Sequence, residues 1–395
     1  MIVHEKLQQS IDILQETDID LWLTLVRETA QMSDPSLPFI AGTNIVWPSC
    51  FIISSCGCKI AIVGTGDANN IRRLDAYDEI ISYDQSIQPP LISVLDRFNP
   101  KRIGLNYSED NNTADGLTYG LYLTLRRLLK DTPYPERFVS AEPAVMRIRG
   151  RKSQSEVTLI EKAIHNTLVL FQEFSEQVST GWTEKDVHRF LKRRMTEMKV
   201  EPAWDREYCP SVNAGLDSLR GHTPPGEVVI KPGHILRLDF GIKQNDYCSD
   251  LQRIWYFLKP NESAPPEDVL VGFETVQKTI MEASKMIRPG VRAYEIDALG
   301  REIIQEAGYP EFMHALGHQV GRNAHDGGTV IAPRWEKYGR RPYDTLEADQ
   351  MYTLELGVQT SAGYAAQEEV VLVTGAGCRF LSEPQKEIYL ITLSR

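Results

Sequence analysis

The first 150 residues alternate between short apolar runs and segments in which apolar residues recur at helical spacing. Two of the apolar runs flank Gly57, and a glycine between strand-like runs predicts a hairpin. Helical spacing occurs at 91–98 and 116–129. The runs that predict strands lie at 20–26, 50–55, 59–63, 79–83 and 102–105. This alternation predicts an α/β domain, and the domain contains no glycine-rich phosphate loop.

The pattern changes near residue 150. A basic stretch at 147–153 leads into an amphipathic segment at 153–178, which predicts one long helix. We therefore expect an N-terminal α/β domain at residues 1–150 and a second domain at residues 151–395. A chain of 395 residues is long enough for both domains to bury a core.

The second domain contains a weak internal repeat. In each copy, two helix starts precede a strand that carries an acid, then a turn, and then a second acid. The first copy supplies Asp239 and Asp250, and the second supplies Glu355 and Glu368. Duplicated units can pack about a pseudo-twofold axis. The repeat therefore predicts an α+β domain with four acids near its centre.

Composition limits the classes of partner and compartment. The formal net charge is −11, whereas nucleic-acid binding needs a basic surface, so we expect no nucleic-acid partner. The N-terminus lacks the apolar core of a signal peptide, and the most apolar stretch, 51–63, is too short to span a membrane. The six cysteines include no CxxC pair, which is typical of reduced thiols. These features predict a cytoplasmic globular protein without a membrane partner.

The first pair of acids suggests a metal site. Asn245 and Asp246 predict a turn, so Asp239 and Asp250 would face each other on adjacent antiparallel strands. Like charges opposite each other are destabilising, and burying both costs several kcal/mol per ion unless a cation compensates. A divalent metal would supply that cation. The alternative is a surface hairpin with both acids in solvent.

The second pair of acids leaves one choice open. Glu355 stands between Leu354 and Leu356, and either Glu368 or Glu369 would accompany it. Consecutive strand residues point to opposite faces. We therefore expect one of the two adjacent glutamates to face the metal and the other to be solvated.

Three of the eight histidines lie close together, at His314, His318 and His325. Gly317 and Gly321 separate them, and glycine lets the backbone approach a site closely. A helix that exposes two of these imidazoles is the alternative, although glycine disfavours it. Oxygen ligands completed by one imidazole suit Mn(II), Co(II), Zn(II) or Fe(II). Two such ions that share carboxylates would lie about 3.5–4 Å apart.

The order and spacing of these residues resemble the pita-bread metallopeptidases, which include methionine aminopeptidase, aminopeptidase P, prolidase and the metal-free creatinase. The resemblance covers most of the chain, and in the second domain four segments carry it: RLDFGIKQNDYCSD, LGHQVGRNAH, YTLELG and EEVVLVT. The segment His222-Thr-Pro-Pro resembles the HGxP segment of the prolidase branch. The N-terminal domain favours the prolidase, aminopeptidase P and creatinase branch over methionine aminopeptidase.

The resemblance implies a creatinase-type N-terminal domain and a pita-bread, creatinase/aminopeptidase-like catalytic domain. It also implies a homodimer and two divalent metal ions, with Mn(II) the first candidate. The alignment of EEVVLVT with the family pattern selects Glu368 rather than Glu369 as the ligand. The implied ligands are Asp239 on one ion, Asp250 and Glu368 as bridges, and His318 and Glu355 on the other ion.

The implied reaction is hydrolysis of an Xaa-Pro bond in a small peptide by a metal-activated water. Glu355 would shuttle the proton, His325 and His222 would stabilise the oxyanion, and His314 would line the proline side of the pocket. Three alternatives stay open: a creatinase-like C–N hydrolase with His222 as base, an inactive peptide-binding homologue and a methionine aminopeptidase. The complete ligand set argues against the creatinase-like reading.

Some positions depart from the family pattern. They are Gln252 for threonine, Leu356 for proline, Asp326 for glutamate and Ala366 for arginine. In prolidase that arginine is linked to recognition of the substrate carboxylate, so the choice between dipeptidase and aminopeptidase stays open. Arg340 or Arg341, in a long connection after His325, would replace the missing charge. The alternative is that this connection is a solvated basic loop.

Overall fold

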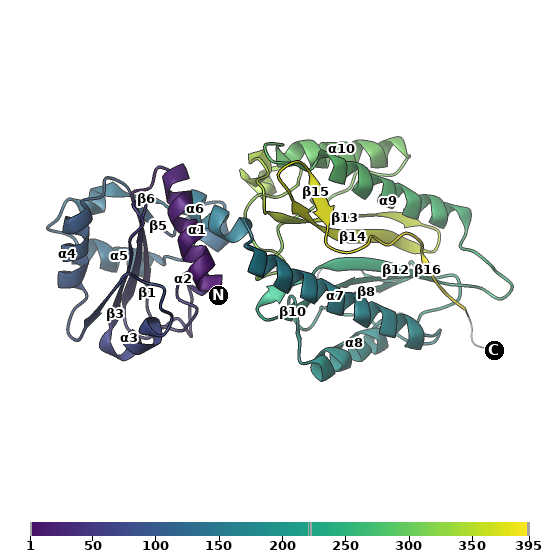
Figure 1. Cartoon of the computed structure of the whole chain (residues 1–395). Coiled ribbons are helices and arrows are strands. Elements are labelled where there is room, and N and C mark those ends of the chain that lie inside the picture. Colours follow the sequence, from purple (N-terminus) through teal and green to yellow (C-terminus); the bar gives the residue numbers. More distant parts are fainter. Residues whose placement is uncertain (1, 220, 222, 393–395) are drawn as a thin grey trace. The chain divides into compact units, whose positions relative to one another are not determined.

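The computed structural model describes residues 2–219, 221 and 223–392. The chain divides into two compact units, Met1–Ser155 and Glu156–Arg395. Figure 1 shows a β-sheet with flanking helices in each unit. The boundary expected after residue 150 falls at the end of helix α6 (Glu142–Gly150), a few residues before the division in the structure.

A mixed sheet forms the centre of the N-terminal unit, in the order β4-β3-β2-β1-β5-β6. Its strands are β1 (Leu21–Val26), β2 (Ser49–Ser54), β3 (Lys59–Gly64), β4 (Glu79–Tyr83), β5 (Ile103–Leu105) and β6 (Phe138–Ser140). All five strands that the sequence predicted are present, and Gly57 turns the β2–β3 hairpin with φ +103°. The α/β prediction for this unit is confirmed.

Helices cover both faces of this sheet. They are α1 (Ile2–Glu16), α2 (Leu37–Ile40), α3 (Thr65–Arg72), α4 (Gln88–Phe98), α5 (Tyr119–Leu128) and α6, with 3₁₀ turns η1 (Asn112–Ala114) and η2 (Tyr134–Arg137). Successive residues of β1 enter different cores, because side chains alternate along a strand. Leu21 packs with residues of α4 and α5, whereas Trp22 packs with residues of α1, α2 and α3.

The second unit contains the predicted repeat. One copy runs α7 (Gln154–Gln177), α8 (Glu184–Met198), β9 (Ile235–Phe240) and β12 (Leu251–Phe257). The other runs α9 (Glu267–Met286), α10 (Ala293–Glu306), β13 (Met351–Thr360) and β14 (Gly363–Val373). The sheet order β13-β14-β12-β9-β8 joins the two copies through an antiparallel β12–β14 contact (Figure 1).

Short elements complete this unit. They are β7 (Glu201–Pro202), β8 (Ser211–Ala214), β10 (Ile242–Gln244), β11 (Tyr247–Cys248), β15 (Cys378–Phe380), β16 (Tyr389–Ile391), η3 (Glu336–Tyr338) and η4 (Arg341–Tyr343). β15 pairs with β14, and β16 pairs with β12.

Apolar side chains anchor the strands against the helices and leave the acids on the other face. Phe171 of α7 packs edge-on against Phe240 of β9, with ring centroids 5.8 Å apart. Leu354 and Leu356 of β13 belong to the core formed with α9 and α10. Because side chains alternate along a strand, Glu355 between these two leucines points away from that core. The apolar neighbours noted in the sequence thus set the direction of the acid.

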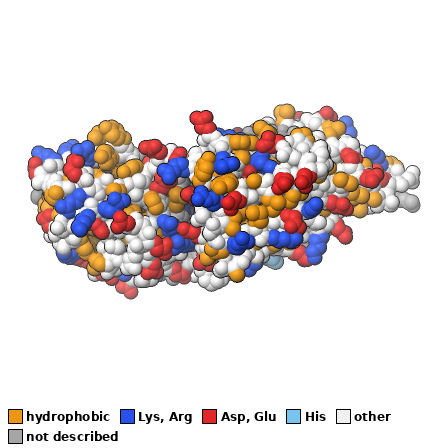
Figure 2. All heavy atoms as spheres, turned by 90° about the horizontal axis from the view of Figure 1, so that it is seen from above, with side chains coloured by type: hydrophobic (Ala, Val, Ile, Leu, Met, Phe, Trp, Pro, Cys, Tyr) orange, Lys and Arg blue, Asp and Glu red, His pale blue; other side chains and the backbone are white. Residues whose placement is uncertain are grey.

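Among the described residues, no helix has both the length and the apolarity needed to cross a bilayer. Leu270, Val271 and Met281 of α9 are nevertheless exposed. Figure 2 shows a surface on which hydrophobic side chains are mixed with acidic and basic ones. Single exposed apolar residues of this kind are normal on a globular protein.

Candidate metal centre

The acids predicted as ligands line up across the central sheet. Asp239 of β9 pairs directly with Gln252 of β12. Gln252 pairs with Glu368 of β14, and Glu368 pairs with Glu355 of β13. Directly paired residues point to the same face of a sheet. Three predicted ligands and Gln252 therefore form one row.

Asp250 joins this row from the end of the hairpin. It lies directly before β12 and two residues before Gln252. The sequence predicted that Asp239 would face Asp250, but Gln252 is the direct partner of Asp239. The chain between the two aspartates forms an additional short hairpin, β10–β11, which pairs with β7 rather than extending β9 and β12. The aspartates are therefore diagonal neighbours.

An extended segment, rather than the alternative helix, delivers His318. The backbone N–H of Thr353 donates to the His318 carbonyl at 2.8 Å, and the N–H of His318 donates to Thr353 Oγ1 at 3.2 Å. Gly317 permits this approach, because a Cβ at that position would lie 2.0 Å from the Thr353 carbonyl oxygen. The glycine noted in the sequence is therefore required by a backbone contact.

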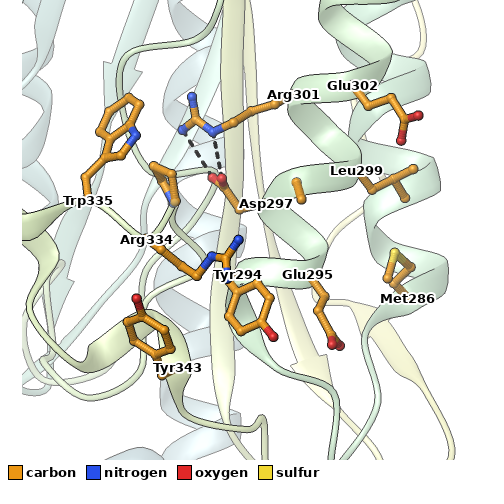
Figure 3. Close-up of a pocket in the computed structure, with 12 residues that line it drawn as sticks. Met286, Tyr294, Glu295, Asp297, Leu299, Arg301, Glu302, Arg334, Trp335 and Tyr343 are labelled. Carbon is orange, nitrogen blue, oxygen red and sulfur yellow. Dashed lines mark hydrogen bonds and ion pairs between the residues drawn. The ribbon is translucent and has the colours of Figure 1, made fainter.

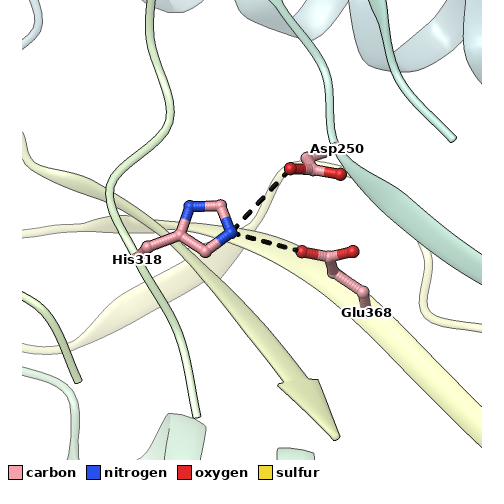
Figure 4. A group of neighbouring side chains, drawn as sticks. All are labelled: Asp250, His318 and Glu368. Atoms are coloured by element: carbon pink, nitrogen blue, oxygen red, sulfur yellow. Dashed lines mark ion pairs between the residues drawn. The ribbon is translucent and has the colours of Figure 1, made fainter. Parts of the chain in front are cut away.

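The imidazole of His318 points between carboxylates, as Figure 4 shows for Asp250 and Glu368. Its Nε2 atom lies 3.5 Å from Glu355 Oε1, 3.8 Å from Asp250 Oδ2 and 3.8 Å from Glu368 Oε1. Single ligand atoms of Asp250, His318 and Glu368 lie within 4.8 Å of one another. Three of the predicted carboxylate ligands thus meet at the predicted imidazole ligand. The fifth predicted ligand, Asp239, stands in the same row as Glu355 and Glu368.

Burial and mutual repulsion dominate the electrostatics of the acids. Burial raises the pKa of Asp250 and of Glu368 well above their ordinary values, and neighbouring carboxylates raise both further. Burial also raises the pKa of Asp239, against the opposing charge of Arg237. These acids therefore resist ionising together unless a cation joins them.

His318 and Glu355 shift in the opposite sense. Burial alone would lower the pKa of His318, but Glu355 and Asp250 outweigh it and raise that pKa to about 9. Burial would raise the pKa of Glu355, but His318 outweighs it and lowers that pKa. The opposite shifts in the two pKa values thus have one cause, the attraction between the His318 imidazole and the carboxylates around it.

One buried oxygen tests whether a metal fits. Glu368 Oε1 is buried and has no hydrogen-bond partner among the described residues, and it faces His318 Nε2. A buried carboxylate oxygen without a partner is costly. A divalent ion among the carboxylates and the imidazole would satisfy it, and this donor set is typical of Mn(II), Co(II), Zn(II) and Fe(II).

The other predicted histidines lie at different distances from the row. The ring of His325 is 4.3 Å from that of His318, centroid to centroid, and its side chain is exposed. His314 is also exposed, and its ring packs edge-on against Phe312 at 5.5 Å. His222 lies outside the described residues. The structure thus brings His325 to the five predicted ligands.

Comparison with known proteins decides the family. Residues 158–375, more than half of the chain, match the family model of metallopeptidase family M24. The chain belongs to this family. The resemblance inferred from the motifs is confirmed, and divalent metal ions are its cofactors.

Relatives of this metallopeptidase extend over both units. The Xaa-Pro dipeptidase of Pyrococcus furiosus is 26% identical over 281 residues, which is 70% of this chain and 76% of that protein. A solved Xaa-Pro dipeptidase from Bacillus anthracis has a TM-score of 0.74 at 22% identity, over 98% of this chain and 100% of the other. A solved X-Pro aminopeptidase from Thermotoga maritima has a TM-score of 0.72 at 22% identity, over 98% of this chain and 99% of the other. The predicted pita-bread fold is confirmed.

Glu369 of the metallopeptidase contradicts one prediction. We expected the glutamate beside the ligand to be solvated, but Glu369 is fully buried. It points to the opposite face of β14, where Arg253 forms an ion pair with it at 2.9 Å and Gln367 donates to it at 2.7 Å. The prediction failed because β14 lies between β13 and β12 and is covered on both faces, which the alternation rule alone does not reveal.

Arg237 is a residue of the centre that the sequence reasoning missed. Its guanidinium donates to Asp239 Oδ2 at 2.9 Å and to Gln252 Oε1 at 2.9 Å. The available signal was its position two residues before Asp239, on the same face of the same strand. Arg341, proposed to replace the missing charge, instead donates to the carbonyl of Tyr338. No hydrogen bond or ion pair among the described residues links Arg340 or Arg341 to the row of acids.

A separate pocket of about 850 Å³ lies beside α10 and the connection 333–343. Figure 3 shows Arg301 paired with Asp297 in this pocket, beside the indole of Trp335. Arg301 also donates to the carbonyls of Phe312 and His314. The pocket contains none of the predicted ligands. Arg301 anchors the segment that leads to His318.

Proposed function

We propose that this metallopeptidase hydrolyses Xaa-Pro bonds near the N-terminus of small peptides, with two divalent ions bound at the row of acids. The observation that carries the proposal is the convergence of Asp250, Glu355 and Glu368 on His318, within 3.5–3.8 Å. The names of the relatives, Xaa-Pro dipeptidase and X-Pro aminopeptidase, support the substrate class.

The five predicted ligands would hold the ions. Asp239 would bind one ion, Asp250 and Glu368 would lie between the two, and His318 and Glu355 would complete the second. Asp250 and Glu368 are each less than 5% exposed, so bound cations would offset the cost of burying these two carboxylates. Bound ions of this kind acidify a water and polarise a carbonyl oxygen.

Glu355 is the candidate proton carrier. Its Oε1 atom faces His318 Nε2 at 3.5 Å, beside the proposed metal position, where it would accept a proton from the metal-activated water. Its Oε2 atom already accepts a hydrogen bond from Gln252 at 2.9 Å, which leaves Oε1 on the side of His318. From there it would pass the proton to the leaving imide nitrogen of proline.

The exposed histidines would act on the substrate. His325 lies beside His318 and faces solvent, so it would donate to the oxyanion that develops at the scissile carbonyl. His222 would assist it, and His314 would line the proline side. Because the nitrogen of an Xaa-Pro bond carries no proton before cleavage, the site needs a shaped pocket more than an acceptor for an amide proton.

Metal removal and substrate choice test the proposal together. The purified chain is dialysed against a chelator, restored with Mn(II), Co(II), Zn(II) or Fe(II), and assayed on Ala-Pro, on Ala-Pro-Ala and on Met-Ala. We expect chelation to lower the rate at least about 100-fold, and Mn(II) to restore it on one or both proline substrates. A Glu355→Gln variant controls for contaminating peptidases, and it should stay inactive with metal.

The peptides that are cleaved distinguish a dipeptidase from an aminopeptidase. Cleavage of Ala-Pro alone identifies a dipeptidase, whereas cleavage of Ala-Pro-Ala identifies an aminopeptidase. Turnover that survives chelation, or activity on Met-Ala alone, overturns the proposal. Mn(II) as the native ion, a homodimer and a cytoplasmic location stay predictions from the sequence, which metal analysis, light scattering and cell fractionation would test.

A further inference from the structure

A hydrogen-bonded bridge connects three acids of the metal centre. Gln252 donates from Nε2 to Glu355 Oε2 at 2.9 Å and to Glu368 Oε2 at 3.0 Å. Arg237 donates from Nε to Gln252 Oε1 at 2.9 Å and from Nη2 to Asp239 Oδ2 at 2.9 Å. One amide and one guanidinium thus hold Asp239, Glu355 and Glu368, which come from three different strands.

The arginine fixes the direction of the amide. A glutamine side chain can present either its oxygen or its NH₂ group to a neighbour. The Nε–H of Arg237 is a donor only, so it requires the oxygen of Gln252. The NH₂ group must then face the two glutamates, and each of its two protons has one carboxylate to bind. The arginine on one side and the carboxylates on the other thus require the same orientation of the amide.

The bridge occupies the outer oxygens of the glutamates and leaves the inner ones available. Gln252 binds Oε2 of both Glu355 and Glu368. The Oε1 atoms of the same residues face His318 Nε2 at 3.5 and 3.8 Å. Each glutamate is therefore held in the rotation that turns one oxygen toward the metal position.

The bridge is itself fixed at its far end. Arg237 donates from Nη1 to Asn213 Oδ1 at 2.8 Å, and Asn213 donates to the carbonyl of Leu219 at 2.8 Å. Gln252 is 2% exposed and the side chain of Arg237 is 12% exposed. Buried, charge-assisted hydrogen bonds of this kind are strong and geometrically specific.

We propose that Arg237 and Gln252 act as positioning residues that fix Asp239, Glu355 and Glu368 in the orientation that binds the metal ions. This inference rests on the proposed metal centre. Side chains behind metal ligands typically change metal affinity 10–100-fold when they are removed. The bridge therefore contributes to metal affinity before any substrate is present.

Metal affinity of the whole chain tests the bridge without an activity assay. Metal-free protein is titrated with Mn(II) by calorimetry, and its melting temperature without metal is measured alongside. For Arg237→Met and for Gln252→Leu we expect the Kd for Mn(II) to rise about 10–100-fold. The double variant should bind only as weakly as the weaker single variant, within about threefold, because both residues act through one bridge.

Two further variants distinguish the geometric role of Arg237 from the effect of its charge and from a general loss of stability. Arg237→Lys keeps the charge but loses the forked geometry, so its Kd should also rise at least about tenfold. Arg194→Met is the matched control, because Arg194 forms a two-point pair with Glu173 on helices α7 and α8. Its affinity for Mn(II) should match that of the unmodified chain.

The outcomes distinguish this inference from the proposed function. If the unmodified chain binds Mn(II) and cleaves Xaa-Pro peptides but Arg237→Met binds Mn(II) equally well, the bridge is refuted and the function stands. If Arg237→Lys restores full affinity, charge alone acts and the positioning role is refuted. If all bridge variants weaken Mn(II) binding but no variant or parent cleaves a proline peptide, the bridge stands and the proposed function fails.

Discussion

Two adjacent acids on β14 meet opposite environments. Glu368 and Glu369 are both buried, at 1% and 0% exposure, and they point to opposite faces of the strand. Glu369 has a cation supplied by the protein, since Arg253 binds both of its oxygens at about 3 Å. Glu368 has no such partner, and its Oε1 atom lacks a hydrogen bond among the described residues.

The difference separates an acid that the protein itself neutralises from the acid that we propose as a metal ligand. On the outer face, Arg253, Gln367 and Gln385 satisfy Glu369 completely. On the inner face, four carboxylates share Arg237 and His318, so negative charge exceeds positive charge. Burial of charge requires compensation. The outer face has this compensation in the chain itself, whereas the inner face lacks part of it, and this shortfall supports the metal ions proposed to bind there.

The largest effect should come from replacing Glu368, the acid on the inner face of β14. In Glu368→Gln we expect the rate on Xaa-Pro peptides to fall about 10³-fold or more, equal to about 4 kcal/mol of barrier, because the amide cannot serve as a bridging ligand. The metal-free protein should be no less stable than the parent, since the exchange removes a repelled buried charge. Peptide assays and urea unfolding without metal check the two halves of this prediction. An active Glu368→Gln variant would contradict the assignment of the ligand.

Replacing Glu369, the acid on the outer face, should lower stability and largely preserve activity. In Glu369→Gln we expect the free energy of unfolding to fall by about 3–5 kcal/mol, because Arg253 would be left buried without a counter-charge. The folded fraction should keep its activity within about tenfold, since Glu369 does not face the row of acids. Urea unfolding and the peptide assay measure both effects.

A double exchange sharpens this result. Replacing both partners, in Arg253→Met with Glu369→Leu, removes the unpaired charge and should recover part of the stability lost in Glu369→Gln. If the double variant were less stable than Glu369→Gln, the cost would lie in packing and in the hydrogen bonds that Arg253 donates to the carbonyls of Gln252 and Glu368, rather than in the unpaired charge.

The sequence predicted most of what positions the site. The turn predicted at Asn245 and Asp246 is present, with φ of 50° and 69°, although it connects β10 and β11. The repeat placed the acids on the strands that converge. These predictions succeeded because they depend on local spacing, which a chain carries in its sequence.

The failures depend on contacts between distant segments. The extra β10–β11 hairpin shifted the partner of Asp239 from Asp250 to Gln252. Glu369 and Arg253, far apart in the chain, formed a pair that strand alternation could not reveal. Alternation puts Arg237 on the face of Asp239, a signal that the sequence reasoning did not use, and only the structure shows that Arg237 bonds to Gln252 on the next strand. Register and sheet order decide such contacts, and neither follows from one strand alone.

An exposed acid completes the comparison and should give the smallest effect. Glu173 of α7 accepts two hydrogen bonds from Arg194 of α8 at 2.8 Å, and about a third of its side chain is exposed. In Glu173→Gln we expect the free energy of unfolding near neutral pH to fall by less than about 1 kcal/mol, because water screens such a pair. Urea unfolding of the parent and the variant measures the difference.

The pH dependence of this pair has a definite sign. The hydrogen bonds and charge of Arg194 hold the pKa of Glu173 below its ordinary value of 4.5. The unfolded chain therefore takes up the proton first as the pH falls, so the pair stabilises the protein above that value and loses its contribution below it. The difference between parent and variant should shrink as the pH falls through this window, and also at high salt. A loss above about 2 kcal/mol at neutral pH would show that exposure does not separate this pair from Glu369 and Arg253.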